Sequence, residues 1–216
     1  MKKILLLASI VALFASCSSK PKLELEVNIS NNDSFKDKMF IVSQKIEGKV
    51  VYSDTIKIKK DNFLLKIPYE GPGLLNISIP EAKIRNVMLA SEKGKINLDF
   101  DGVKSYISGT PLNDRLQAYY LESDSVSLLF SNLESELALI KDTKQFTSKM
   151  EEEFAQRRKK LLIENTDRIV AFIKENIDNP IGEYYFSIYY ITFIPERKME
   201  LNSFASEKLK KEFRIQ

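Results

Sequence analysis

Short segments with a period of two follow one another through the first half of the chain. The first of them reads LELEVNI, in which every second side chain is apolar, and this alternation is typical of a half-buried strand. The same pattern, broken by polar turns or by glycine and proline, predicts strands at residues 23–29, 39–46, 50–58, 63–69, 74–79, 84–90, 96–100 and 103–108. Asp101-Gly102 is the strongest signal for a two-residue hairpin. This succession of short strands predicts an antiparallel β-sandwich or barrel.

The period changes to that of a helix after Gly109. Thr110 suits the N-cap and Pro111 the first position of a helix whose apolar residues recur at helical spacing as far as Ile140. A capping box that starts at Ser148 predicts a second helix, which either continues or restarts before it ends near residue 177. Further helices are expected at residues 181–193, from 195 onwards and at 206–213.

These patterns predict an α+β protein with two modules. An N-terminal antiparallel β-sandwich or barrel covers residues 23–109, and a C-terminal helical module covers residues 110–216. Because no long linker separates them, we expect the two modules to pack together.

The N-terminus has the pattern of a secretory signal. Basic residues at positions 2 and 3 precede an apolar stretch over residues 4–14, which is shorter than the roughly 20 residues that span a bilayer. The segment Phe14-Ala15-Ser16-Cys17 resembles a bacterial lipobox, in which cleavage before the cysteine is followed by its acylation.

The lipobox predicts three features of the mature protein. We expect a signal peptide at residues 1–16, a lipidated tether at residues 17–22, and fatty acyl chains such as palmitate on Cys17. Several acyl chains anchor a protein stably, whereas one holds it only marginally. The tether lacks an acidic cluster that would resemble a surface-export signal, so we expect a cell-envelope protein facing the periplasm. The alternative is an ordinary cleaved signal followed by a chance cysteine.

Composition excludes several chemistries. The 216 residues include one Cys, no His and no Trp, so there is no intrachain disulfide, no His-based triad and no HExxH zinc site. Removing residues 1–16 takes away two lysines and no acid, which lowers the formal charge from +3 to +1. A near-neutral balance and export both argue against nucleic acid as a partner. No glycine-rich phosphate motif, metal-ligand spacing or catalytic set occurs, so we expect no enzyme activity and no cofactor or metal.

Two constellations leave alternatives open. Tyr185, Tyr189 and Phe193 fall on one stripe of a short helix, and they form either a docking face for a partner or part of a core whose hydroxyls reach its edge. Glu153 is spaced to pair with Arg157 in a charge run over residues 151–160. That run is either a solvated helix face or a patch for lipid head groups.

The order of motifs resembles a known family. The segments that carry the resemblance are Ser53–Ile56, Asn62–Leu65, Val87–Ile96, the junction Ile107-Ser108-Gly109-Thr110-Pro111-Leu112-Asn113-Asp114, and Asn176–Gly182. They are similar to the domain of unknown function 4369 at the N-terminus of Bacteroidota lipoproteins, over roughly residues 23–213. Many of those lipoproteins carry a C-terminal thioredoxin-like domain of the TlpA, ResA or AhpC/TSA type, which implies thiol–disulfide chemistry in the whole protein. Here no CxxC occurs, so the resemblance transfers no functional residue apart from Cys17.

The sequence therefore predicts a membrane-anchored periplasmic lipoprotein that acts as a non-catalytic binding or accessory module. Its expected partners are the membrane, through acylated Cys17, and a thioredoxin-like or other envelope protein. The alternative is a truncated or remnant thiol–disulfide oxidoreductase that lacks its thioredoxin-like domain. A third reading is a carrier of a small apolar ligand near the aromatic helix.

Overall fold

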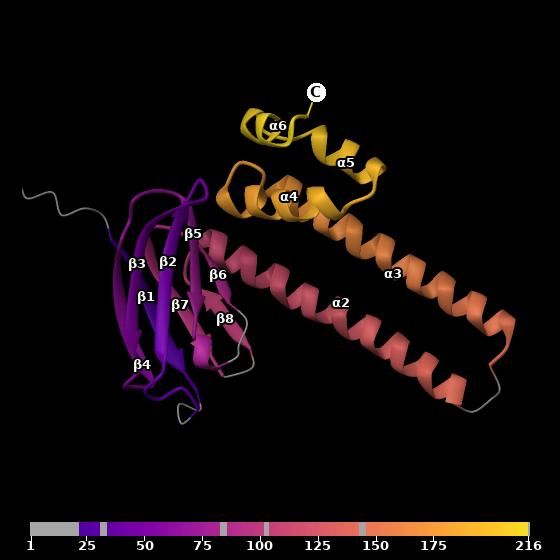
Figure 1. Ribbon diagram of the computed structural model, residues 1–216, viewed down its shortest axis with the longest axis horizontal. Helices are drawn as coiled ribbons and strands as arrows, with labels where there is room; N and C mark the ends of the chain where they lie inside the picture. The colour runs from indigo at the N-terminus through magenta and orange to yellow at the C-terminus, as the bar shows by residue number, and fades with distance from the viewer. Residues whose placement is uncertain (1–21, 31–33, 83–85, 102–103, 143–145, 216) are drawn as a thin grey trace, which may run out of the picture.

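A β-sandwich and a set of helices make up the protein (Figure 1). The computed structural model describes residues 22–30, 34–82, 86–101, 104–142 and 146–215. The predicted signal peptide and Cys17 lie outside the described residues. Within them the chain forms two four-stranded sheets followed by five helices, which confirms the predicted α+β class.

The strands form two separate sheets, so the β module is a sandwich and not a closed barrel. One sheet has the order β4 (Asn62–Pro68), β1 (Lys22–Ile29), β7 (Gly94–Phe100), β8 (Ser105–Ser108). The other has the order β3 (Lys49–Lys57), β2 (Met39–Ile46), β5 (Gly73–Ser78), β6 (Val87–Ser91). A short 3-10 helix, η2 (Pro80–Ala82), follows β5.

One strand pair departs from the antiparallel prediction. β1 and β7 run parallel, with Leu25 beside Ile96, while the other neighbouring pairs of described strands are antiparallel. Parallel neighbours need a long connection. Here the connection between β1 and β7 contains the whole second sheet and β4, a long-range arrangement that local periodicity does not encode.

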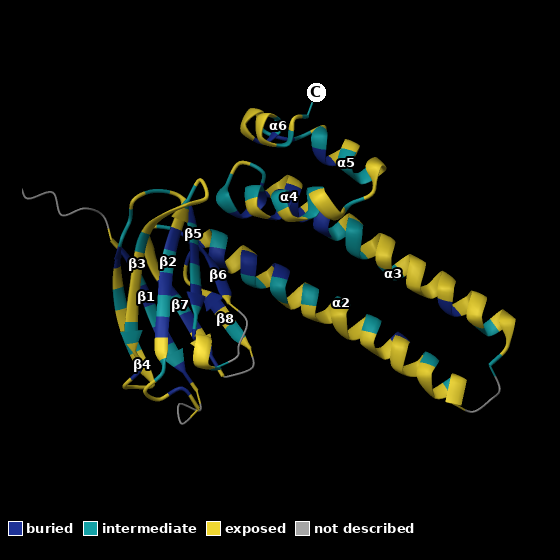
Figure 2. Ribbon diagram, viewed as in Figure 1, coloured by how far each residue is buried: buried dark blue, intermediate teal, exposed yellow. Residues whose placement is uncertain are grey.

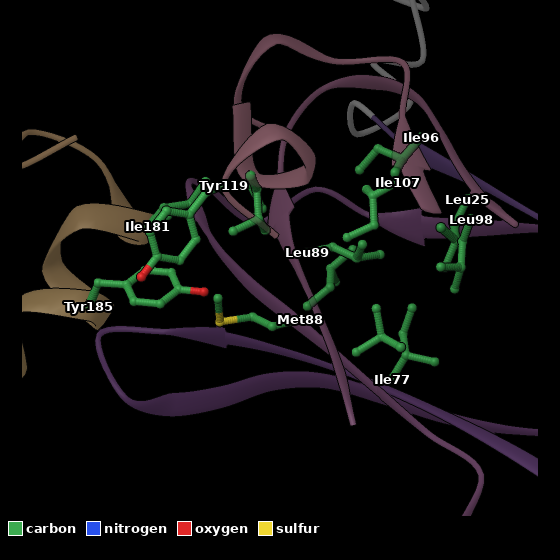
Figure 3. Close-up of a cluster of buried hydrophobic side chains, with 14 of the residues drawn as sticks. Leu25, Ile77, Met88, Leu89, Ile96, Leu98, Ile107, Tyr119, Ile181 and Tyr185 are labelled. Carbon is green, nitrogen blue, oxygen red and sulfur yellow. The ribbon is translucent and has the colours of Figure 1, made fainter. Parts of the chain in front are cut away.

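The core follows the predicted alternation. In β1 the apolar residues Leu23, Leu25 and Val27 are fully buried, and the intervening Glu24 and Glu26 are partly exposed. β6 differs because all five of its residues are buried. Figure 3 shows the reason: Leu89 points among the sandwich residues, whereas Met88 points towards tyrosines of the helical module. The helices therefore cover the second face of β6.

Two long helices form a hairpin that projects from the sandwich (Figure 1). They are α2 (Pro111–Asp142) and α3 (Ser148–Glu175), and α3 is continuous through the point where a restart was possible. Thr147, not Ser148, is the N-cap of α3, because its hydroxyl accepts a hydrogen bond from the backbone N–H of Met150 at 3.3 Å. The shorter helices α4 (Pro180–Thr192), α5 (Pro195–Asn202) and α6 (Glu207–Phe213) follow.

The first turns of α2 take the place of a neighbouring strand for both sheets. The Asn113 side-chain oxygen accepts from the backbone N–H of Ala90 at 2.9 Å, and its Nδ2 donates to the carbonyl of the same residue at 3.0 Å. One turn later Gln117 Oε1 accepts from the backbone N–H of Ile107 at 2.7 Å. Amide side chains of one helix thus satisfy backbone groups of β6 and β8, which are the last strands of their sheets.

The N-terminus of α2 is capped from a distant strand loop. Glu92 accepts hydrogen bonds from the backbone N–H groups of Leu112 at 2.9 Å and Asn113 at 3.3 Å. Thr110, the expected N-cap, instead donates its hydroxyl to the same Glu92 carboxylate at 2.6 Å. A carboxylate at a helix N-terminus satisfies unpaired donors and complements the helix dipole. The prediction that α2 begins after Thr110 is therefore correct. The side chain that caps the helix is Glu92, and not Thr110 as was predicted.

Two glycines of the motifs are required by close approach. Gly109 has φ +107°, and a Cβ there would overlap the carbonyl oxygen of Lys95. At Gly182, in the first turn of α4, a Cβ would overlap the carbonyl oxygen of Asn176. Asn179 caps the same turn by accepting from the N–H of Ile181 at 3.0 Å. The backbone at both helix starts therefore lies against another element, which a larger residue would prevent.

Replacing Asn113 with alanine should destabilise the whole fold. The substitution leaves the buried N–H and C=O of Ala90 without partners, which corresponds to a loss of about 2 to 4 kcal/mol in the free energy of unfolding. Urea denaturation of the two proteins measures this difference. Asn132→Ala is the matched control, because Asn132 is an exposed asparagine on the same helix. Equal effects of the two substitutions would contradict the strand-replacing role of Asn113.

Candidate docking surface

The predicted aromatic stripe on α4 is divided between core and surface. Tyr185 is only 8% exposed, and its ring contacts those of Tyr119 at 5.0 Å and Phe172 at 5.4 Å between centroids. Tyr189 and Phe193 are half-buried and continue the stack, with ring centroids 5.3 Å apart. Tyr185 therefore belongs to the layer that joins α4 to α2 and α3, and a partner could touch only the outer two members of the stripe.

A guanidinium lies in the same layer. The ring of Tyr119 stacks on Phe172 with a centroid distance of 3.9 Å, and the guanidinium carbon of Arg168 lies 4.6 Å from the Tyr119 ring centroid. Arg168 also donates through Nη2 to the side-chain oxygen of Asn165 at 2.9 Å, whereas its buried Nε and Nη1 make no hydrogen bond. Sequence reasoning missed this residue. Its spacing could have indicated this role, because Arg168 lies four residues before Phe172 and therefore on the same face of α3, which faces α2.

Burial controls the protonation of the tyrosines in this layer. Desolvation raises the pKa of Tyr119, Tyr120 and Tyr185, and it raises that of Tyr120 to about 12. The Tyr120 hydroxyl donates to the backbone carbonyl of Met88 at 3.3 Å. The protonated Tyr120 thus serves as a hydrogen-bond donor that fastens α2 to β6. The raised pKa values move all three tyrosines away from the range useful for a general base.

An apolar face of α4 lies outside the core. Tyr184, Ile188 and Ile191 are spaced three or four residues apart on α4 and are 38%, 40% and 72% exposed. Ile194, which is 61% exposed, lies just beyond the end of α4 as the N-cap of α5. We call this set the α4 outer face. It adjoins the predicted stripe but consists of different side chains. Residues that recur at this spacing on a helix form a continuous surface, and a continuous exposed apolar surface is typical of an interaction site.

The outer half of the α2–α3 hairpin extends beyond the sandwich and is mostly exposed (Figure 2). Leu133 and Phe154 are its buried contacts. Arg157 donates through both Nη atoms to Glu136 on α2, at 2.9 and 2.7 Å, so the predicted partner Glu153 was wrong. This bidentate pair lowers the pKa of Glu136 and raises that of Arg157. A fork of two parallel hydrogen bonds across the helices is favoured over a single contact along one helix.

Two grooves lie along this outer half. One has a volume of about 220 Å³ and is lined by Leu133, Glu134, Leu137, Lys141, Phe146, Glu151, Phe154, Ala155 and Arg158. The other has a volume of about 300 Å³ and is lined by Leu129, Asn132, Leu133, Glu136, Arg157, Lys160, Leu161 and Glu164. Both are small for a site that holds an organic ligand, and neither adjoins the aromatic stripe of α4. They give no support to the ligand-carrier reading.

Among the residues that the structure describes, no three His, Cys, Asp or Glu side chains form a group that could hold a metal ion. None of the described helices combines the length and the apolar character that crossing a membrane requires.

Residues 23–116 match a family model described as a domain of unknown function (DUF4369). The chain therefore carries a domain of the DUF4369 family, as the motifs predicted. The match ends in the second turn of α2, so it covers the sandwich, Glu92 and Asn113 but not the later helices to which the resemblance was extended. The comparisons with curated proteins and with solved structures gave no match.

Stability should fall steeply above pH 10. The pKa of Tyr120 and Tyr185 is raised only in the folded chain, so the unfolded chain loses these protons first as the pH rises above about 10. The free energy of unfolding then falls by up to about 1.4 kcal/mol per pH unit for each buried tyrosine. Urea denaturation between pH 9 and pH 12 measures this slope.

Tyr185→Phe should reduce that slope, because the variant lacks one of the ionising hydroxyls. Tyr106→Phe is the control, since Tyr106 is 43% exposed on β8. A slope that responds equally to both variants would contradict the assignment of the effect to the buried layer.

Proposed function

We propose that this protein is a membrane-anchored periplasmic lipoprotein that acts as a non-catalytic binding or accessory module. The anchor is the acylated Cys17, joined to the sandwich by the tether at residues 17–22. The bound partner is another protein of the cell envelope, for example a thioredoxin-like protein. Neither nucleic acid nor a cofactor has a part in this proposal.

The observation that carries the binding role is the α4 outer face. Ile191 and Ile194 are 72% and 61% exposed, although they lie beside a tightly packed aromatic layer. Helix α4 is held at its N-terminus by the Asn179 cap and at its middle by the packing of Phe186 on Phe213, with ring centroids 5.6 Å apart. An apolar surface on a helix fixed in this way is preorganised for a partner, because little conformational freedom is lost on binding.

The polar residues of the family motifs support a non-catalytic role. Glu92, Asn113 and Asn179 are all engaged in capping helices or completing sheet edges. A catalytic group must face a space that a substrate can enter, and these side chains face the backbone of their own chain.

The remnant-oxidoreductase reading has one supporting observation, the DUF4369 match. Thiol–disulfide exchange requires a free thiolate, and Cys17 is the only cysteine in the sequence. Lipid attached to the sulfur of Cys17 removes that thiol, so the oxidoreductase reading needs a thioredoxin-like domain that the 216 residues do not contain. The intact mass of the protein extracted from its native membrane distinguishes the two readings. A mass equal to residues 17–216 plus acyl chains supports the binding module, and a mass larger by a whole domain supports the oxidoreductase reading.

Cys17→Ala should release the protein from the membrane fraction. Without the cysteine no lipid can be attached to the chain, and the sandwich has no other proposed anchor. Fractionation of cells followed by immunoblotting measures the distribution, with Ser19→Ala as the control that stays in the membrane. Full membrane retention of the Cys17→Ala variant would defeat the lipoprotein proposal.

A photoreactive residue at position 191 should capture one specific envelope protein in intact cells. The same residue at position 159, which is exposed on α3, serves as the control that captures none. Ile194→Lys should abolish capture from position 191, because it places a charge in the apolar contact. Capture that survives this substitution, or that occurs equally from position 159, would count against the α4 outer face as the docking site.

A further inference from the structure

The end of the sandwich at which β1 begins carries exposed lysines from both sheets. Lys22 is the first residue of β1 and pairs with Pro68 at the end of β4. Lys93 immediately precedes β7, whose first residue pairs with Leu23. Its ammonium group lies 5.4 Å from the centroid of the Tyr69 ring. These residues therefore lie together at one end of their sheet, which we call the tether end.

The second sheet adds Lys45 and Lys49 to the tether end. Both are exposed, and they flank the turn between β2 and β3. This turn lies at the same end because Gln44 of β2 donates to the carbonyl oxygen of Gly71 at 3.3 Å, and Gly71 belongs to the connection that leaves β4. The tether end thus presents four exposed lysines, which are Lys22, Lys45, Lys49 and Lys93.

The charges of these four lysines remain available. Within the described ranges of the chain they form no ion pair. By contrast, Lys66 and Lys95 on the same end of the first sheet lie 3.6 Å from Glu24 and 2.7 Å from Glu26. The carboxylate of Glu92, which precedes Lys93, caps α2. Four ammonium groups therefore face water at the tether end.

Helix α6 extends the tether end. Lys208 of this helix lies 4.0 Å from Glu47 in the turn between β2 and β3, and Figure 1 shows α6 beyond the same end of the sandwich. Lys211 and Arg214 are further exposed cations of this segment. Glu70, an acid of the tether end, has a partner within the chain. The helix therefore adds positive charge to the surface that the sandwich presents here.

The opposite end of the sandwich is also rich in lysine, so charge alone does not select a surface. Lys59 and Lys60 are exposed in the turn between β3 and β4. They lie next to Asn62, which pairs with Asn28 near the other end of β1. The eight residues of β1 span roughly 26 Å, so the two groups of lysines are separated by about that distance.

The length of chain before β1 distinguishes the two ends. The sequence advances five residues from Cys17 to Lys22, and five residues span at most roughly 18 Å when fully extended. A lipid on Cys17 therefore keeps the tether end close to the bilayer surface. Attraction between exposed charges fades over about 8 Å at physiological salt, so proximity decides which lysines can act on the head groups.

We propose that the tether end, together with α6, docks on anionic lipid head groups through Lys22, Lys45, Lys49 and Lys93. The proposal rests on the acylated Cys17 of the proposed function and adds the phosphate head group as a second contact. The contact orients the anchored protein, so that β1 begins at the bilayer and the far ends of α2 and α3 lie away from it (Figure 1). It does not replace the lipid as the anchor.

A fluorescence experiment tests this orientation. Residues 17–216 are coupled through Cys17, the sole cysteine, to a maleimide lipid in vesicles, so the anchor does not depend on acylation by the cell. The sequence contains no tryptophan, so Tyr69→Trp at the tether end and Phe146→Trp on the hairpin each provide a unique fluorescent donor. Energy transfer to dansyl-labelled lipid measures how close each position lies to the bilayer.

Transfer from position 69 should be higher on vesicles of equimolar phosphatidylglycerol and phosphatidylcholine than on vesicles of phosphatidylcholine alone. Salt at about 0.5 M should remove this difference, because it screens the lysines from the head groups. Transfer from position 146 should stay low on both kinds of vesicle.

Lys22→Glu combined with Lys49→Glu should remove most of the difference at position 69. Each lysine near an anionic surface strengthens binding roughly fivefold, so the double variant should weaken docking at least about tenfold. Lys59→Glu combined with Lys60→Glu is the matched control, because it makes the same change of charge at the opposite end and should leave the difference intact.

Equal transfer from position 69 on both kinds of vesicle, or an equal loss in the two double variants, would overturn the proposal. High transfer from position 146 would also overturn it, because the basic run of α3 would then be the surface that meets the head groups. Fractionation of the Cys17→Ala variant tests the anchor separately in cells. A failure of docking is therefore distinguishable from a failure of the lipoprotein proposal.

Discussion

The pairing of the Asn113 amide with both backbone groups of Ala90 is the contact on which the arrangement of the two modules depends. A strand at the edge of a sheet needs a partner for its backbone, and here a helix supplies one through a side chain. Gln117 does the same for β8 one turn later. Because α2 completes both sheets at once, its direction relative to the sandwich is set, and the hairpin it forms with α3 must project outwards (Figure 1).

The family motifs acquire a structural meaning from this contact. Gly109 permits the close passage by Lys95, Asp114 accepts from the N–H of Gly109 at 2.9 Å, and Glu92 caps the helix that follows. All of these residues lie within the part of the chain that matches the DUF4369 model. They organise a junction between a sandwich and a helix, and the surface proposed for a protein partner lies on the helices beyond it.

The helical module consists of a fixed aromatic layer and an apolar surface beside it. Buried tyrosines and Arg168 join α2, α3 and α4 above β6, where desolvation keeps the tyrosines protonated. The α4 outer face adjoins this layer and remains exposed. Because the packing of α4 fixes this face, little conformational freedom is lost in a contact that it makes.

The order and type of the elements, their approximate bounds and the buried face of β1 could be predicted from the sequence, because a period of two or 3.6 residues is a local property. The junction motif also marked the region where Asn113 and Asp114 act. The sequence could not show that β1 and β7 are parallel, that Glu92 caps α2, that Tyr185 is buried or that Arg157 pairs with Glu136. Each of these joins residues far apart in the chain, or depends on which face of a helix a distant element covers, so only the tertiary structure decides it.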